Sequence, residues 1–513
     1  MVRLYKVFTP TILGWLLIWG NSSASNLMNV YEAALASDPQ FKIARARWLA
    51  EKENLAVSRA SLFPQIAVQG NLARNRRVME VGNGAIAPAY YSNSLGYGLI
   101  ISQPIFDFKR LASLWGTQAV VRKSHAIFMV EEEQLLYRVA ERYFNVLLAK
   151  GVLTYAKANR VANERFFTQS KHKYEVGLTA VTDLEESRRN YERALSIEIK
   201  SHNDLDGAFE MLNEMTGVRY TDLNSLKKNF PLLSPEPADV EAWVRAAERQ
   251  NFELMAANFS ILQAKENIKI QNANHFPTIT FNGGYNYGYD KNYNGSGSSS
   301  RTKGASLGIE IGIPIFSGGR DIAASRQANY QYQGVLSEFE KKHREVVSNT
   351  RQAYLGVISS ISKIKADIQA IKAAESALKS MQANYAVGRK TMSDVLDSQS
   401  KLYEVQTEYA KDEHSYILLL LKLKMSVGSL VINDLLDVNA WLENNNSISP
   451  RKNIPKDVSK IEIKTKKINK NKANRFQDNL ISSKKLIIDP NRKNSIVVLD
   501  VDKIKPVSIS VQN

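Results

Sequence analysis

Cysteine is absent from the 513 residues of the sequence. Its absence excludes disulfide bonds, thiol catalysis and iron–sulfur clusters held by cysteine thiolates. The six histidines show no metal-ligand spacing, and they stand at positions 125, 172, 202, 275, 343 and 414. A nucleophile elbow, a P-loop and a dinucleotide-binding fingerprint are also missing. The sequence therefore predicts a protein that is not an enzyme and that holds no metal and no cofactor.

Long apolar runs are confined to the N-terminus. Two basic residues there precede an apolar stretch from Val7 to Trp19, and the small residues Ser22–Ser25 follow it. This layout predicts a cleavable secretory signal over residues 1–25, so that the mature chain begins near Asn26. Later segments lack the roughly 18 consecutive apolar residues of a transmembrane helix, and we expect no helical membrane span.

Acidic residues are outnumbered by basic ones, and the formal net charge is +17. Most of this excess is local, since residues 451–493 hold 14 Lys or Arg and four Asp or Glu. The stretch is rich in asparagine and has no apolar periodicity, which is typical of disordered segments. We therefore expect a solvated basic tail over residues 443–513. A nucleic-acid-binding arm is the alternative, but an exported protein rarely meets nucleic acid, so no nucleic-acid partner is expected.

Proline is absent from residues 105–230 and again from residues 315–449. Without the strongest helix breaker, both arms are free to form long helices. In the first arm, apolar residues recur at heptad spacing, at Leu136, Val139, Tyr143, Val146 and Leu153. A helix from Asp107 to Lys173 would measure roughly 100 Å at about 1.5 Å per residue. The pattern predicts coiled-coil arms that project from whatever anchors them.

Each arm contains nearly the same elbow, written KYEVGLTAVTDLEES from Lys173 and NYAVGRKTMSDVLDS from Asn384. Gly177 and Gly388 give each elbow a residue that tolerates a left-handed backbone. We therefore predict two helix–turn–helix tips, at about residues 174–182 and 385–393. Two patterns typical of capping boxes indicate where the return helices begin, Thr182-x-x-Glu185 and Thr391-x-x-Asp394.

The repeat extends beyond the elbows. Three residue pairs are each separated by 211 positions, namely Gly177 and Gly388, Gly217 and Gly428, and Tyr143 and Tyr354. A constant offset at several places indicates an internal duplication. We therefore expect two repeats, over residues 26–230 and 231–442, each built of helices and one β-hairpin.

The hairpins are expected before the arms, where apolar and polar residues alternate. Alternation predicts four strands, at about residues 64–74, 94–105, 277–289 and 305–316. Strands of about ten residues with one apolar face, and with tyrosines toward their ends, are typical of outer-membrane barrels. A soluble sandwich is the alternative, but it does not explain why hairpins lead into such long helices.

Four strands are too few to close a barrel around a lumen. An open sheet edge in lipid would leave backbone groups unpaired, at a cost of several kcal/mol each. The chain is therefore expected to assemble with copies of itself. Three chains would supply twelve strands, an even number and enough to enclose water.

Several motifs, in order and twice over, resemble those of the TolC family of outer-membrane channels. They are NLMNVYEAALASDP at the expected mature start, LFPQI with HFPTI, QPIFD with IPIFSGG, RYFNVL, YEVGLTAVTDL and YAVGRKTMSDVLDSQSKLYEV. Together they span residues 26–442. The resemblance implies a membrane β-barrel joined to an all-α coiled-coil tunnel. In a homotrimer this would give a twelve-stranded barrel in the outer membrane of a Gram-negative bacterium and a twelve-helix tunnel in the periplasm, with a small mixed domain around the tunnel.

The same resemblance implies a function and partners. Such a channel passes proteins or small toxic compounds from the periplasmic side to the exterior, in type I protein secretion or multidrug efflux. Its implied partners are a periplasmic adaptor, or membrane fusion protein, and an inner-membrane transporter of the ABC or the proton-driven kind. A periplasmic coiled-coil scaffold without a pore is the alternative, and the two β-hairpins argue against it.

Acids follow both elbows and are candidates for a ring at the channel entrance. Asp394 and Asp397 are three residues apart, so they share one face of the return helix. The resemblance places these two at the periplasmic entrance, where like charges would concentrate cations and repel anions. Asp183 and Glu186 hold the matching positions in the first repeat. The alternative for an acid this near a helix start is a simple cap.

The resemblance also implies gate and docking positions at the tips. The gate positions hold Thr182, Asp183, Tyr385 and Lys390, with His172 where glutamine is expected and Gln382 where an acid is expected. His172 would gain charge at mildly acidic pH and alter closure, unless it is an ordinary solvated histidine. The positions implied to receive the adaptor are Val176, Gly177, Leu178, Val387 and Gly388.

Overall fold

The structure is a computed structural model. It describes residues 25–78, 80–81, 85–86, 90–227, 229–292, 299–443, 486–487 and 497–498. The expected signal segment up to residue 24 and most of the expected basic tail lie outside these residues. The chain divides into two compact units, Met1–Ser447 and Ile448–Asn513. In the second unit, the described residues form two short antiparallel strands, β7 (Leu486–Ile487) and β8 (Val497–Val498).

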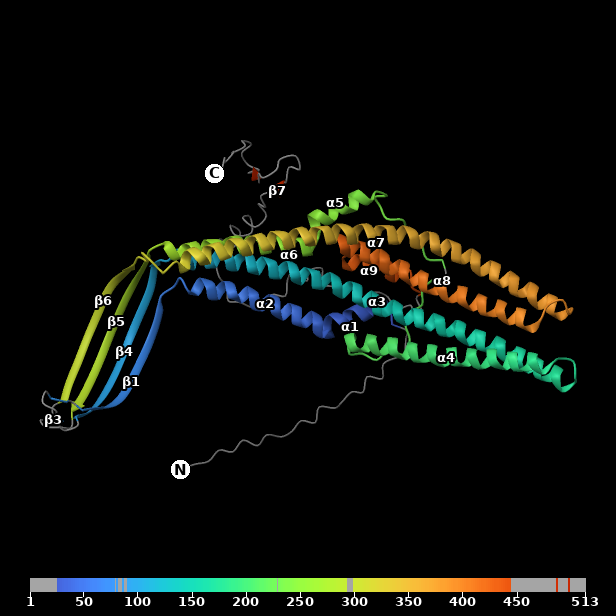
Figure 1. Ribbon diagram of the computed structural model, residues 1–513, viewed down its shortest axis with the longest axis horizontal. Helices are drawn as coiled ribbons and strands as arrows, with labels where there is room; N and C mark the ends of the chain where they lie inside the picture. Colours follow the sequence, from blue (N-terminus) through green and yellow to red (C-terminus); the bar gives the residue numbers. More distant parts are fainter. Residues whose placement is uncertain are drawn as a thin grey trace, which may run out of the picture. The chain divides into compact units, whose positions relative to one another are not determined.

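The first unit contains two series of elements that resemble each other (Figure 1). The first series consists of α1 (Leu27–Ser37), α2 (Pro39–Ala60), β1 (Gln65–Arg77), β2 (Glu80–Val81), β3 (Ala85–Ile86), β4 (Tyr90–Phe106), α3 (Phe108–Glu175) and α4 (Val181–Thr216). The second consists of α5 (Val240–Gln250), α6 (Phe252–Asn272), the 3-10 turn η1 (Ala273–His275), β5 (Thr278–Asn292), β6 (Ser299–Gly312), α7 (Arg320–Ala386), α8 (Met392–Val427) and α9 (Ile432–Ala440).

The four longest helices form two antiparallel hairpins, α3 with α4 and α7 with α8 (Figure 1). α3 has 68 residues and α7 has 67, while α4 and α8 have 36 each. At about 1.5 Å per residue, α3 and α7 each measure roughly 100 Å. The heptad positions of the first arm are buried as the spacing predicts, since Leu136, Val139, Tyr143, Val146 and Leu153 are all 6% exposed or less.

The core of this unit gathers where α1, α3, α4, α7, α8 and α9 meet. Tyr143 on α3 is fully buried there, and its hydroxyl donates to the carbonyl oxygens of Asn224 at 2.8 Å and Ser25 at 3.2 Å. The single hydroxyl proton is thus shared between two carbonyl groups of the chain segments that cross the helices, and the contact with Asn224 is the shorter one. On α8, the buried Tyr416 donates to the carbonyl oxygen of Leu233 at 3.0 Å.

β1, β4, β5 and β6 form one antiparallel sheet in that order, so the two hairpins join side by side (Figure 1). β1 and β6 are the two edges. The register places Val68, Leu99, Tyr285 and Ala305 in one row across the sheet. The next row is Gln69, Gly98, Asn286 and Gly304. Successive rows belong to opposite faces, so the alternation in the sequence becomes an apolar face and a polar face.

The apolar face is exposed to the surroundings of the single chain. Ten of its residues are between 38% and 82% exposed, namely Ile66, Val68, Leu72, Leu95, Tyr97, Leu99, Tyr285, Leu307, Ile309 and Ile311. The polar face carries asparagines that lie over glycines, and a side chain at Gly98 would collide with that of Asn286. An apolar face this large requires a cover that the described residues of one chain do not supply.

The strand β6 ends at Gly312, four residues before the expected end at residue 316. Pro314 explains the difference, because proline has no N–H to donate to a neighbouring strand. Strands β1 and β4 extend further toward their connecting loop than the alternation indicates, to Arg77 and from Tyr90. Their polar loop-proximal residues pair through the backbone, which does not require an apolar side chain.

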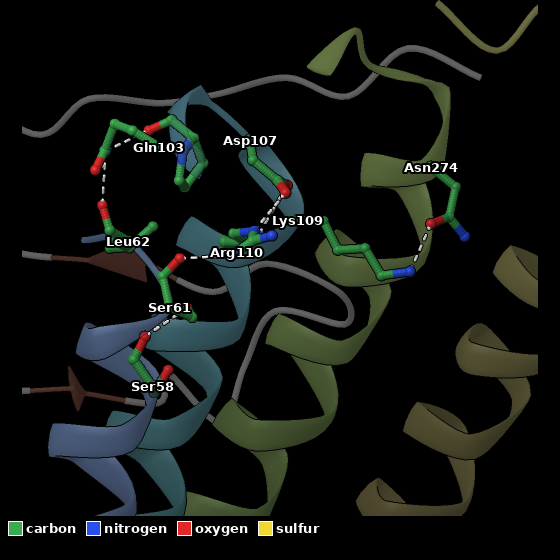
Figure 2. Close-up of polar contacts among 9 residues, drawn as sticks. Ser58, Ser61, Leu62, Gln103, Asp107, Lys109, Arg110 and Asn274 are labelled. Atoms are coloured by element: carbon green, nitrogen blue, oxygen red, sulfur yellow. Dashed lines mark hydrogen bonds and ion pairs between the residues drawn. The ribbon is translucent and has the colours of Figure 1, made fainter. Parts of the chain in front are cut away.

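Polar side chains fasten the junction between the sheet and the helices (Figure 2). Three of them bridge separate segments: Gln103 Nε2 donates to Leu62 O at 3.0 Å, Arg110 Nη1 donates to Ser61 O at 2.6 Å, and Lys109 Nζ donates to Asn274 Oδ1 at 3.0 Å. Asp107 caps α3 by accepting from the backbone N–H of Arg110 at 3.1 Å. The end of α2, the start of α3 and the turn before β5 are thereby held together.

Candidate functional site

The two helix tips have the same backbone. α3 ends at Glu175 and α7 at Ala386, and the following glycines, Gly177 and Gly388, have φ of 73° and 72°. In the first tip, Leu178 N donates to Lys173 O at 2.8 Å. In the second, Arg389 N donates to Asn384 O at 2.9 Å. These two hydrogen bonds are related by the same offset of 211 positions. Each belongs to a helix C-cap in which a glycine adopts the left-handed conformation.

The return helices begin differently in the two tips. Thr391 caps α8 with a complete capping box, in which Asp394 N donates to Thr391 Oγ1 at 3.2 Å and Thr391 N donates to Asp394 Oδ2 at 3.0 Å. The box predicted at Thr182 and Glu185 is wrong, because α4 already begins at Val181 and its cap residue, Ala180, has no side-chain acceptor. Thr182 therefore lies inside the helix.

The first tip uses a different hydroxyl. Thr179 Oγ1, just before α4, donates to Asp183 Oδ2 at 2.7 Å. Asp183 lies in the first turn of α4, where a carboxylate is favoured by the partial positive charge of the helix N-terminus. The contact orders the first tip without a side chain on the cap residue itself.

Asp394 is held in its ionised form by the second tip. The hydrogen bond from the Thr391 backbone N–H lowers the pKa of the Asp394 carboxyl, and the nearby Lys390 acts in the same direction. Lys390 Nζ lies 3.7 Å from Asp394 Oδ1. Asp397 is one turn further along α8 and is exposed. The second tip thus presents two carboxylates on one side of α8.

The structure brings the two tips into contact at two places. Lys173 Nζ donates to Tyr385 Oη at 3.1 Å and lies 4.6 Å from the centroid of the Tyr385 ring. Ser393 Oγ donates to Glu186 Oε1 at 2.8 Å. One predicted gate residue and one predicted acid therefore link the two hairpins of a single chain. Lys173 and Ser393 were not among the predicted site residues, although both lie within the repeated elbows.

The remaining predicted gate residues are placed apart from these contacts. His172 has a side chain that is 73% exposed, and its Nδ1 lies 3.4 Å from Glu175 Oε2 on the same helix. Thr182 and Gln382 are both exposed. The influence of His172 on closure stays a prediction.

The ends of the tips are apolar and open. Val176, Leu178 and Val387 are 68%, 76% and 67% exposed. A Cβ atom added at Gly177 or Gly388 would meet no other atom within 4 Å. Exposed aliphatic side chains around two open glycines form a surface on which another backbone can approach closely.

Metal binding and helical membrane insertion find no support in the part of the chain that the structure describes. No group of three or more His, Cys, Asp or Glu side chains in it is arranged to hold a metal ion. Among the described helices, none combines the length and the apolar character needed to span a membrane.

Comparisons with known proteins identify the family. The family model described as Outer membrane efflux protein matches residues 30–218 and 243–429. The chain is 31% identical to Outer membrane protein TolC of Vibrio cholerae over 446 residues, which are 86% of this chain and 99% of the relative. It is 26% identical to the alkaline protease secretion protein AprF of Pseudomonas aeruginosa over 424 residues, 82% of this chain and 88% of the relative.

Solved structures show the same fold. The CmeC outer membrane channel of Campylobacter jejuni superposes with a TM-score of 0.66 at 13% identity, covering 85% of this chain and 97% of that chain. The resemblance to TolC-type channels that the motifs indicate is confirmed by the family match and by these relatives. The chain therefore belongs to the outer membrane efflux protein family and is an outer-membrane channel rather than an enzyme.

Proposed function

We propose that three copies of the chain form one channel for type I secretion and efflux, with twelve strands in the membrane and twelve helices in the periplasm. The observation that carries this proposal is the four-stranded sheet. It has one exposed apolar face, and its two edge strands, β1 and β6, have no further strand partner among the described residues. Pairing β6 of one subunit with β1 of the next would satisfy the backbone groups of both edges. Twelve strands would leave room for an aqueous interior.

The two repeats support the same arrangement. The family model matches the chain twice, over two segments of similar length, and each segment contains one long helical hairpin. Residues 26–230 and 231–442 are accordingly two structural repeats. Three chains with two repeats each would surround the channel with six similar hairpins, whose tips close one end of it.

The tips form the periplasmic entrance, and their acids form a ring. In a trimer, Asp394 and Asp397 supply six carboxylates around one axis, and Asp183 and Glu186 supply six more. Because the tip lowers the pKa of Asp394, its charge persists at neutral and mildly acidic pH. A ring of fixed negative charge in a constriction favours cations.

The gate involves contacts within and between the hairpins. Lys173 and Tyr385 link the two hairpins of one chain, as do Ser393 and Glu186. Thr182, Lys390, His172 and Gln382 are exposed at or near the tips and are available to neighbouring subunits. Opening requires the tips to separate, so these polar contacts set part of the barrier.

Partner proteins complete the export route. Relatives of the TolC type act in tripartite efflux and secretion systems, and the channel acts with adaptor partners. The docking surface consists of the exposed tip residues Val176, Gly177, Leu178, Val387 and Gly388. An inner-membrane transporter, of the ABC or the proton-driven kind, supplies the energy. The outer-membrane lipid contacts the apolar face of the sheet.

Single-channel recording tests the entrance. We expect the purified trimer to be cation-selective in planar bilayers, and D394N/D397N to shift the reversal potential under a salt gradient toward that of an unselective pore. Asparagine keeps an oxygen that accepts from Thr391 N–H, so the cap of α8 is preserved.

The matched control is D204N/E214Q, which removes two exposed acids further along α4 and should leave selectivity unchanged. Unaltered selectivity in D394N/D397N would assign Asp394 to capping alone. A purified chain that is monomeric and needs no detergent would remove the channel proposal altogether.

A further inference from the structure

The apolar face of the sheet changes character toward its loop end. The rows nearest the helices contain aliphatic residues such as Ile279, Ile309 and Leu307. Tyrosines follow: Tyr97 and Tyr287 are paired across β4 and β5, and their rings stack at 4.7 Å. The order is aliphatic first and tyrosine second, as in the wall of an outer-membrane barrel.

Basic residues occupy the same face at and beyond the tyrosines. They are Arg74 and Arg76 on β1, Lys291 on β5, and Arg301 and Lys303 on β6, and we call them the basic belt. The strand register places Arg301 opposite Tyr289 and Lys303 opposite Tyr287. All five side chains are exposed.

The described strand residues of the apolar face include no acidic residue. Asp290 and Glu310 are the acids of β5 and β6, and the register places both in rows of the polar face. The two faces therefore differ in charge as well as in polarity. Among the described strand residues, the acids of the sheet and the basic belt thus lie on opposite faces, so the apolar face has a net positive charge at its loop end.

The height of the belt matches the edge of a membrane. From Ile279 to Tyr289 the strand advances ten residues, or about 34 Å, which becomes about 26 Å along the barrel axis at a tilt of about 40°. The hydrocarbon band of an outer-membrane barrel is about 25 Å tall. Arg301, opposite Tyr289, is thus located where the hydrocarbon ends and the lipid headgroups begin.

One contact shows how the belt is positioned. The guanidinium carbon of Arg301 lies 5.7 Å from the centroid of the Tyr289 ring. A guanidinium held over an aromatic face keeps its N–H groups available at its edges, and these suit the oxygens of a phosphate group. Arginine supplies three of the five cations, and its planar group can bind a phosphate through two parallel hydrogen bonds.

We propose that the basic belt binds the phosphate groups of anionic lipids at the loop end of the barrel. The inference rests on the proposed membrane location of the sheet, and it adds a specific ligand class to it. The lipid chains pack against the aliphatic rows, the tyrosines lie at the interface, and the belt pairs with the headgroup phosphates. In a trimer the belt recurs on each subunit and surrounds the barrel.

Native mass spectrometry of the detergent-solubilised oligomer tests the proposal, with diphosphoryl lipid A as the probe. We expect the wild type to retain the lipid. The belt variant, R74Q/R76Q/K291Q/R301Q/K303Q, should retain at least about threefold less lipid than the wild type. The control variant, K157Q/K200Q/K365Q/K372Q/K379Q, removes five exposed cations from the helices and should bind as the wild type does.

Four outcomes distinguish the possible failures. Equal retention by the wild type and the belt variant would overturn the proposal, provided that both form conducting oligomers. Competition by inorganic phosphate as strong as by the lipid would show that the belt binds free anions rather than lipid. If the belt variant does not assemble, the binding of diphosphoryl lipid A to the wild type is compared with the binding of fully dephosphorylated lipid A. Equal binding of the two lipids overturns the proposal. A chain that forms no detergent-requiring oligomer would instead contradict the proposed function.

Discussion

Glu133 is a buried carboxyl group in the middle of α3. It is 6% exposed, and its Oε1 accepts from the backbone N–H of Leu430 at 3.1 Å. Burial raises the pKa of Glu133 to about 8, and the charges of Glu253 and Glu132 act in the same direction. The group is therefore protonated in the folded chain at neutral pH, while in the unfolded chain it ionises near pH 4.5.

We predict that E133Q removes a pH dependence of stability. Between about pH 4.5 and pH 8 the folded chain retains a proton that the unfolded chain has lost, so wild-type stability falls by up to about 1.4 kcal/mol per pH unit as pH rises. Glutamine still accepts from Leu430 N–H and has no charge to bury. Thermal unfolding in detergent from pH 5 to pH 9 should show a smaller decline in stability for E133Q than for the wild type, with the stabilities of the two proteins closest at pH 5.

The exposed Glu375 supplies the control variant, E375Q. A decline in the stability of E133Q equal to that of the wild type would refute the assignment.

At the tips, the offset between the two repeats predicted the positions of equivalent residues correctly, whereas the local capping-box pattern did not. The offset of 211 positions pairs Asp183 with Asp394, and both lie in the first turn of a return helix. The same offset pairs Thr391 with Ala180, which shows why a capping box at Thr182 is wrong. A threonine followed by an acid three residues later also occurs inside helices, so the local pattern does not fix the helix start.

The contacts between the two tips could not be predicted from the sequence. Lys173 and Tyr385 are 212 positions apart, and Ser393 and Glu186 are 207 apart. Whether such residues meet depends on how the two hairpins pack along their whole length, and a single sequence contains no direct signal for that packing. The repeat indicated that two similar tips exist, and the structure showed which atoms join them.

At the scale of elements, two glycines end the return helices with the same backbone and different surroundings. Gly217 follows α4 with φ of 67°, and Gly428 follows α8 with φ of 81°. A Cβ atom at Gly217 would lie 3.8 Å from Ser37 Oγ, an ordinary contact. At Gly428 it would lie 2.6 Å from Gln250 O and 2.9 Å from Asn251 Cα, where the turn between α5 and α6 packs against the end of α8.

We predict that G428A destabilises the chain more than G217A does. Both variants force alanine into a left-handed backbone, at a cost of about 1 kcal/mol. G428A must also displace backbone atoms of the turn between α5 and α6, which adds about 1–3 kcal/mol. Thermal unfolding followed by circular dichroism measures the difference. Equal losses in the two variants would mean that the close approach at Gly428 relaxes freely.

The helices could be predicted in length because both arms lack proline and the first arm keeps a heptad spacing. The strands could be predicted in position because their faces alternate, whereas their ends could not. Backbone pairing carries β1 and β4 past the last alternating apolar residue, and Pro314 ends β6 before the alternation stops. Sequence patterns thus report where side chains are buried more directly than where backbone pairing ends.

At the scale of the whole channel, the sheet has the features of an incomplete membrane wall. Its aliphatic face is exposed in the single chain, and its edge strands β1 and β6 have no neighbour on their outer sides among the described residues. Lipid would cover the face, and pairing with other subunits would cover the edges. The two requirements belong together, because an open sheet edge is costly in lipid and tolerable in water.

Adjacent residues on β1 allow the membrane wall to be tested by one matched pair of substitutions. Val68 lies in the middle of the apolar face and is 79% exposed, while Gln69 points to the polar face.

We predict that V68K prevents assembly of the channel, because a lysine near the middle of the hydrocarbon costs about 2–4 kcal/mol in each subunit. Q69K places the same charge toward the aqueous interior and should assemble normally. The measurement is the amount of heat-sensitive oligomer in isolated outer membranes. In water both positions would accept lysine, so equal amounts of V68K and Q69K oligomer would show that the apolar face does not meet lipid.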